Sequence, residues 1–139
     1  MIGFLLDTNV ISEPSKADPS PSVLRWIADT EEHALFLSAL TFGEIKRGIC
    51  LLPVSKKLER YQRFLDALGQ RFENRVLAFD RAVAEQWGVL LARCSLNGTP
   101  IPTIDSMLAA TAVAHDLTLV TRNIDDFRHA GVSLFNPFS

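Results

Sequence analysis

Three carboxylates, far apart in the chain, lie at the end of an expected strand or early in an expected helix. Asp7 comes directly after the apolar residues Phe4–Leu6, Glu44 lies early in an expected helix, and Asp105 lies in the first turn of another. Each has an ordinary structural use, because Asp suits helix N-termini and Glu suits a solvated helix face. If the three meet, their charges raise one another's pKa unless a cation neutralises them. Oxygen ligands of this kind favour Mg²⁺ or Mn²⁺, which can support attack of water on a phosphodiester.

A fourth polar position occurs in the sequence VTRNIDDF, after a late apolar run. Asn123 has the residue type of a helix N-cap, and Asp125 and Asp126 would then lie in the first helical turn. If the run before them is a strand of the same sheet, Asn123 would add an amide to the three carboxylates. The residue pattern alone leaves both roles open.

Short apolar runs alternate with helical patterns along the whole chain. Strands are expected at residues 2–6, 34–37, 76–79, 117–120 and 132–135. Helices are expected at residues 21–30, 40–52, 55–72, 81–96, 104–116 and 123–129. This alternation predicts an α/β fold in which helices cover both faces of a parallel sheet. Ligands of such sheets bind beyond the carboxyl ends of the strands, where Asp7 is placed.

Within the expected helix 40–52, Glu44 flanks the apolar stripe rather than opposing it. Gly48 lies one turn further on, and a glycine inside a helix costs about 1 kcal/mol relative to alanine. We therefore expect a close approach of another part of the chain to Gly48.

Length and composition indicate an ordinary globular domain. The chain has 139 residues, of which 47% are hydrophobic and 22% charged, and no run approaches the ~18 apolar residues of a membrane span. Its first residues lack the basic flank of a signal peptide. Cys50 and Cys94 are expected to be small core residues. The three histidines are scattered along the chain, so no zinc site is expected. A reducing, cytoplasmic setting and no membrane association follow as expectations.

The charge is unevenly distributed. The net charge is −2, yet residues 46–75 contain eight basic and three acidic side chains, a local excess of +5. Such a segment is either a solvated helix face or a basic flank that holds a polyanion beside an acidic site. Charge does not separate these alternatives.

Four motifs together resemble the PIN-domain ribonucleases, and within them the VapC/FitB-like toxins of bacterial toxin–antitoxin pairs. The likeness runs from residue 1 to about residue 137 and is least specific between residues 52 and 79. It is carried, in this order, by LLDTNVIS, LSALTFGEIKRG, PTIDSMLAATAVAHDLTLVTRNIDDF and LFNP.

The resemblance implies a single PIN domain over residues 1–139, with a three-layer α/β/α fold and a mostly parallel central sheet. It implies an Mg²⁺-dependent endoribonuclease (Mn²⁺ being an alternative) whose metal ligands are Asp7, Glu44 and Asp105. Asn123 occupies the fourth acidic position of the family, and its neutral amide leaves open whether a second ion binds. The remaining residues that the resemblance brings to the site are Thr8, Asn9 and Thr121, which would orient the carboxylates by hydrogen bonds, and Asp126, which could compensate for Asn123.

The resemblance also implies partners: an RNA substrate, a second copy of the chain in a homodimer, and a cognate antitoxin in a hetero-oligomer. An Arg or Lys of the antitoxin would reach Asp7 and Asp105 in place of the metal. Trp26 and Phe42 either anchor the antitoxin or pack in the core. Which RNA is cut does not follow from the sequence.

Three other functions fit parts of the pattern. A haloacid-dehalogenase-type phosphatase needs a second Asp where Asn9 stands, and a phospho-receiver domain needs a Lys where the chain has Arg122 and Asn123. A PIN-like module that binds RNA or protein with little or no cutting is the remaining alternative, and only Asn123 favours it.

Overall fold

A five-stranded parallel sheet forms the centre of the molecule. The computed structural model describes residues 2–138. Its strands have the order β3-β2-β1-β4-β5 and every neighbouring pair is parallel. The strands are β1 (Phe4–Leu6), β2 (Leu35–Ser38), β3 (Val76–Leu77), β4 (Thr118–Val120) and β5 (Leu134–Phe135). The predicted α/β class is therefore confirmed.

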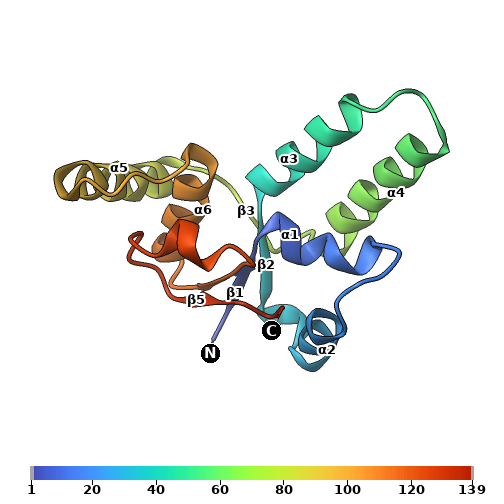
Figure 1. Cartoon of the computed structure of the whole chain (residues 1–139), viewed down its shortest axis with the longest axis horizontal. Coiled ribbons are helices and arrows are strands. Elements are labelled where there is room, and N and C mark those ends of the chain that lie inside the picture. The colour runs from blue at the N-terminus through green and yellow to red at the C-terminus, as the bar shows by residue number, and fades with distance from the viewer. Residues whose placement is uncertain (1, 139) are drawn as a thin grey trace.

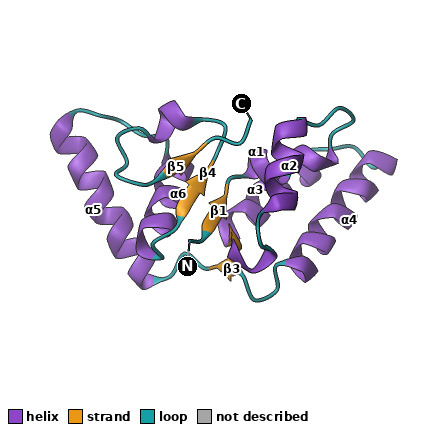
Figure 2. Cartoon of the chain, turned by 90° about the horizontal axis from the view of Figure 1, so that it is seen from below, coloured by secondary structure: helices purple, strands orange, loops and turns teal. Residues whose placement is uncertain are grey.

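Helices cover both faces of this sheet (Figures 1 and 2). Two helices, α5 (Arg81–Asn97) and α6 (Thr103–Ala114), pack against each other on one side. On the other side lie α1 (Thr8–Ile11), α2 (Pro21–Asp29), α3 (Ala39–Cys50) and α4 (Lys56–Arg71). Three short 3₁₀ turns complete the described chain: η1 (Glu13–Ser15), η2 (Glu32–Ala34) and η3 (Ile124–Phe127).

The central strand β1 supplies both layers of the core. Its side chains alternate between the two faces, as the pleat of a strand requires. Leu5 packs with Leu90 and Leu108 in the layer of α5 and α6, whereas Leu6 packs with Val10 and Phe72 in the opposite layer. All six are buried. Because apolar residues are needed on both faces, β1 reads as a continuous apolar run until it reaches the sheet edge at Asp7.

Several predicted details differ from the structure. The expected strand 76–79 contains only Val76–Leu77, because Asp80 begins the next helix by accepting a hydrogen bond from the Val83 N–H at 3.0 Å. The expected helix 123–129 is the 3₁₀ turn η3, and the Asn123 side chain does not cap it. The expected strand 132–135 contains only Leu134–Phe135, and the turns η1 and η2 were not predicted.

Two expectations about small residues were wrong. Cys94 is buried as expected, but Cys50 is exposed at the end of α3. A Cβ built on Gly48 would meet no atom within 4 Å, so the predicted close approach is absent. No helix within residues 2–138 combines the length and apolar character that crossing a bilayer would need.

Candidate active site

Asp7 lies at the carboxyl end of β1 and begins α1. Its Oδ1 accepts a hydrogen bond from the Thr8 N–H at 2.7 Å, which makes Asp7 the N-cap of that helix. Its Oδ2 accepts from the Thr121 hydroxyl at 2.8 Å and from the Asn9 amide at 3.4 Å. Burial raises the pKa of Asp7, and these three hydrogen bonds oppose that shift. Asp7 therefore caps α1 and also lies at the predicted site.

The polar residues around Asp7 are ordered by a chain of hydrogen bonds. Thr121, fully buried after β4, accepts from the Asn123 N–H at 3.0 Å while it donates to Asp7. Asn9 accepts from the Arg122 N–H at 3.3 Å. Each hydroxyl or amide thus has its orientation set by the backbone of the segment after β4. Thr8, Asn9 and Thr121 occupy the positions that the sequence predicted for orienting groups.

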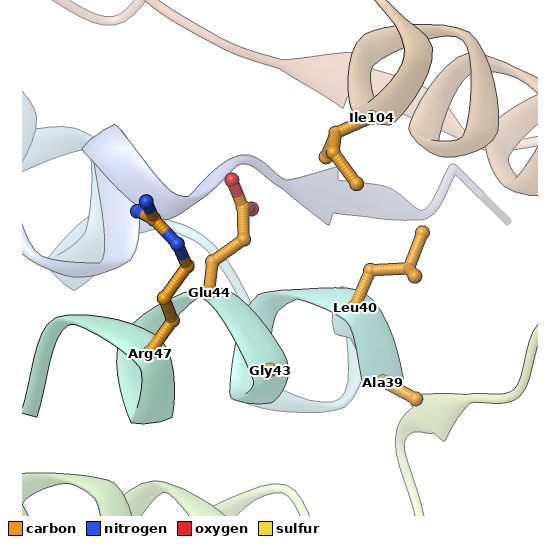
Figure 3. A pocket seen from close by; sticks show the side chains of 6 residues that line it. All are labelled: Ala39, Leu40, Gly43, Glu44, Arg47 and Ile104. Atoms are coloured by element: carbon orange, nitrogen blue, oxygen red, sulfur yellow. The ribbon is translucent and has the colours of Figure 1, made fainter. Parts of the chain in front are cut away.

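Glu44 lies on α3 and is joined to the same region by Thr8. The Thr8 hydroxyl donates to Glu44 Oε1 at 2.9 Å. Burial is the largest cause of a raised pKa at Glu44; the bond from Thr8 lowers this pKa and the charge of Asp7 raises it further. Figure 3 shows the Glu44 carboxylate projecting from α3 toward the ribbon of β1 and α1. The predicted position of Glu44 beside the buried face of its helix is therefore observed.

Asp105 lies in the first turn of α6 and is half-buried. Burial, followed by the charges of Asp7, Asp126 and Glu44, raises its pKa to about 6. Among the described residues, no hydrogen bond to its carboxylate opposes that shift. Four acidic side chains therefore share one electrostatic field at the edge of the sheet; we call Asp7, Glu44, Asp105 and Asp126 the acidic cluster.

Asn123 and Asp126 have different relations to that cluster. Both residues are exposed and line the same polar cavity of about 440 Å³. Of Asn123, only the backbone N–H enters the hydrogen-bond chain at Asp7. The charge of Asp126, by contrast, raises the pKa of both Asp7 and Asp105. Asp126 is thus coupled to the predicted ligands through its charge.

The donor set suits a hard cation that retains part of its water shell. Carboxylate oxygens are what Mg²⁺ and Mn²⁺ prefer, and Mg²⁺ is usually held by one or two carboxylates and several waters. Within residues 2–138, no three acidic, histidine or cysteine side chains form a ready-made metal cage. One oxygen of Glu44 is hydrogen-bonded to Thr8, so the arrangement fits an ion bound partly through water. Repulsion within the acidic cluster would fall when such an ion binds.

Two cavities open beside Glu44. One, of about 610 Å³, contains Arg47 and Ile104, which the sequence had not placed at the site (Figure 3). The position of Arg47 one helical turn after Glu44 was the available signal. The other, of about 290 Å³, lies between Thr8 and Glu44 on one side and Tyr61 and Phe64 of α4 on the other.

Trp26 and Phe42 belong to the core rather than to these cavities. The Trp26 ring lies 5.2 Å from that of Phe4 in an edge-to-face arrangement and 5.6 Å from that of Phe135. Phe42 is partly buried in the layer of Leu6. Of the two roles that the sequence left open for these residues, the structure supports core packing.

A sequence model of the PIN domain matches residues 4–132. The chain is 39% identical over 136 residues to the plasmid stability protein StbB of Pseudomonas syringae pv. tomato, covering 97% of this chain and 98% of that protein. It is 30% identical over 127 residues to a tRNA(fMet)-specific endonuclease VapC of Salmonella typhimurium, covering 91% of each chain. The solved structure of FitAB bound to a DNA fragment has a TM-score of 0.91 and 35% identity, covering 98% of this chain and 96% of that one. The chain therefore belongs to the PIN-domain family, in its VapC/FitB-like group of ribonuclease toxins.

Proposed function

We propose that this protein is an Mg²⁺-dependent endoribonuclease that acts as the toxin of a toxin–antitoxin pair. The observation that carries the proposal is that Thr8 joins two carboxylates of the acidic cluster, its N–H donating to Asp7 at 2.7 Å and its hydroxyl to Glu44 at 2.9 Å. The charges of both carboxylates also act on Asp105. A fold that gathers mutually repelling charges at a strand end is organised to bind a cation there. The arrangement occurs in a chain whose relatives include a VapC endonuclease.

The residues that would hold the ion are Asp7, Glu44 and Asp105. When bound, Mg²⁺ or Mn²⁺ would acidify and orient an attacking water and stabilise charge on the phosphate. Asp7 is held in place by Thr8, Asn9 and Thr121, so its oxygens keep a fixed direction. Glu44 can move more freely, because Thr8 is its one hydrogen-bond partner among the described residues. Asp126 adds negative charge to the site.

The macromolecular partners also belong to the proposal. A cognate antitoxin would cover the acidic cluster with an Arg or Lys near Asp7 and Asp105, and the toxin would be a cytoplasmic homodimer. The solved relative FitAB is a complex on DNA, which supports the expectation of such an assembly. Because one relative is named for cutting tRNA(fMet), transfer RNA is the first substrate to examine.

The experiment is cleavage of total RNA and transfer RNA by the purified toxin, freed of any antitoxin, in Mg²⁺ and in EDTA. Asp7→Asn preserves a residue that can cap α1, and Asp105→Asn removes a side chain that makes no hydrogen bond within residues 2–138. Both variants should be inactive, whereas the control Asp29→Asn, exposed at the end of α2, should cut as the unmodified protein does.

Cleavage that persists in EDTA or in both site variants would refute the proposal. RNA binding without any cleavage by the unmodified protein would instead support a binding module. The expected product ends are a 3′-hydroxyl on the upstream fragment and a 5′-phosphate on the downstream fragment.

A further inference from the structure

We propose that Arg47 and the cavity that it lines form a nucleotide-binding subsite beside the acidic cluster. In this subsite the Arg47 guanidinium binds a phosphate adjacent to the one that is cut, and the neighbouring nucleoside lies against Leu40 and Ile104. The inference rests on the proposed ribonuclease function and adds to it a substrate-positioning residue.

Arg47 and Glu44 lie three residues apart on α3, so their side chains emerge on the same face of the helix. Figure 3 shows both side chains projecting to the same side of α3, toward β1 and α1. They line a single cavity of about 610 Å³, a volume within the range of small-molecule sites. One wall of this cavity thus carries a carboxylate of the acidic cluster and the next helical turn carries a cation.

The charge of Arg47 is available for a ligand. Three cations line the cavities around the acidic cluster: Lys16, Arg47 and Arg122. Lys16 forms an ion pair with Glu13 at 3.0 Å, and the Arg122 guanidinium lies 4.7 Å from the centre of the Phe138 ring. Within residues 2–138, the Arg47 guanidinium has neither an ion pair nor a hydrogen bond. A guanidinium with free donors is well suited to bind a phosphate in a bidentate manner.

The rest of the cavity is apolar and open. Leu40 is partly buried and Ile104, projecting from α6, is 38% exposed. Gly43 lies between Leu40 and Glu44 on α3, where a Cβ would meet no atom within 4 Å. Glycine is a poor helix former, and neither packing nor backbone conformation requires it here. Its missing side chain leaves room in the cavity, and apolar walls of this kind can hold the face of a nucleobase.

A purely structural role for Arg47 is the main competing explanation. It lies in the last turn of α3, where a cation complements the helix dipole. Removing such a cation would lower stability but would not alter the number of phosphate contacts. The salt dependence of RNA binding separates the two roles, because each lost contact to a single strand reduces the slope of log K against log salt by about 0.7.

The test compares Arg47→Gln, Arg47→Lys and Gly43→Leu with the control Arg25→Gln, an exposed arginine on α2 that lines none of the described cavities. The probe is a labelled single-stranded RNA that the unmodified protein cuts or, if it cuts none, one that it binds. Binding is measured over a range of salt concentrations with Asp105→Asn as the background, so that no probe is consumed. Steady-state cleavage is measured in the unmodified background.

Arg47→Gln should raise KM about tenfold, leave kcat within about twofold, and reduce the salt slope by about 0.7. Arg47→Lys should recover much of the slope, because it restores the charge. Gly43→Leu should raise KM without changing the slope, because it fills the cavity and leaves the charge in place. Arg25→Gln should resemble the unmodified protein in all three quantities.

An unchanged salt slope in Arg47→Gln overturns the proposal, whether or not its melting temperature falls. Loss of binding to a co-expressed antitoxin with unaltered RNA binding also overturns it, since the cavity would then serve a protein partner. If the unmodified protein cuts no RNA but the Asp105→Asn background still loses slope with Arg47→Gln, the subsite stands and the proposed catalytic function fails.

Discussion

The Thr121 hydroxyl donates a hydrogen bond of 2.8 Å to Asp7 Oδ2, joining two residues that lie 114 positions apart in the sequence. Both side chains are buried, and the bond connects the ends of the adjacent strands β1 and β4. Because Thr121 accepts simultaneously from the Asn123 N–H, its proton is directed at Asp7. The predicted ligand at the end of β1 is thus oriented by a residue from the end of its neighbour.

Thr121→Val should weaken metal binding while keeping the fold. Valine has nearly the same shape, but Asp7 loses the hydrogen bond that most strongly lowers its pKa, which therefore rises further. We expect a loss of about 10- to 100-fold in Mg²⁺ affinity or activity, the usual effect of removing a group that orients a metal ligand. Magnesium titrations of cleavage measure this. Thr118→Val, at the opposite end of β4, is the matched control, and equal magnesium requirements for the two variants would contradict the prediction.

Ionisation of Asp105 should lower the stability of the protein as the pH rises from about 4 to about 6. The pKa of Asp105 is raised from its ordinary value of 3.8 to about 6, so the folded state retains a proton that the unfolded chain releases. Ionisation of Asp105 therefore costs stability through this window, and the raised pKa values of Asp7 and Glu44 act in the same direction.

Asp105→Asn should remove the part of the pH dependence of stability that arises from ionisation of Asp105. Since Asp105 is only partly shielded from water, we expect the variant to be on the order of 1 kcal/mol more stable at neutral pH. Urea unfolding at several pH values, without divalent metal, measures both effects. A variant less stable than the unmodified protein at neutral pH would show that Asp105 stabilises α6 as a helix-dipole partner instead.

Asp126 and Asn123 should differ in their influence on magnesium. Both side chains line the same polar cavity, but only Asp126 carries a charge, and that charge raises the pKa of Asp7 and Asp105. Asp126→Asn should therefore weaken Mg²⁺ binding about tenfold, while Asn123→Ala should change it little. Calorimetric titration with Mg²⁺ compares the two, with Asp125→Asn as the control next to Asp126. If Asn123→Ala weakened Mg²⁺ binding more than Asp126→Asn, the prediction would be wrong and the Asn123 side chain would be the fourth group of the metal site.

Arg75→Met should destabilise the fold without affecting RNA binding by the folded protein. The Arg75 guanidinium donates to the carbonyls of Glu32, Leu35 and Arg71 and to the Glu32 carboxylate, at 2.6 to 2.8 Å. Its removal should cost about 1–3 kcal/mol, because charge-assisted hydrogen bonds of a mostly buried guanidinium are broken, while the Glu32 carboxylate remains half exposed to water. Arg71→Met should cost less, since its ion pair with Glu32 is more exposed. Urea unfolding distinguishes them; equal costs would contradict this account.

That network also divides the basic segment 46–75. Arg71 and Arg75 bind Glu32, whose pKa they lower to about 2, and so they belong to the scaffold. Lys46 donates to Gln62 of α4 at 2.8 Å. Arg47 alone among the basic residues of this segment lines a cavity that includes Glu44. Under the proposed subsite, the two roles that charge left open for the segment would belong to different residues.

Much of the architecture follows from local patterns. The apolar run of β1, the amphipathic spacing of α4 and the small residues of α6 each predict their element, because burial and helical periodicity are properties of neighbouring residues. The carboxyl end of β1 could be assigned to a site edge for the same reason, since parallel strands place their ends together. Short elements were less predictable, because the end of β3 depends on a single capping hydrogen bond, which Asp80 accepts from the Val83 N–H.

From residue order alone, the class of fold, the family and the positions of Asp7, Glu44 and Asp105 near one sheet edge could be inferred. Residue order could not reveal that Thr121 bonds Asp7, that the charge of Asp126 acts on Asp105, or that Arg47 shares a cavity with Ile104. These relations join segments on different strands and helices. They depend on strand order, helix rotation and side-chain direction, which only the packing of the whole chain fixes.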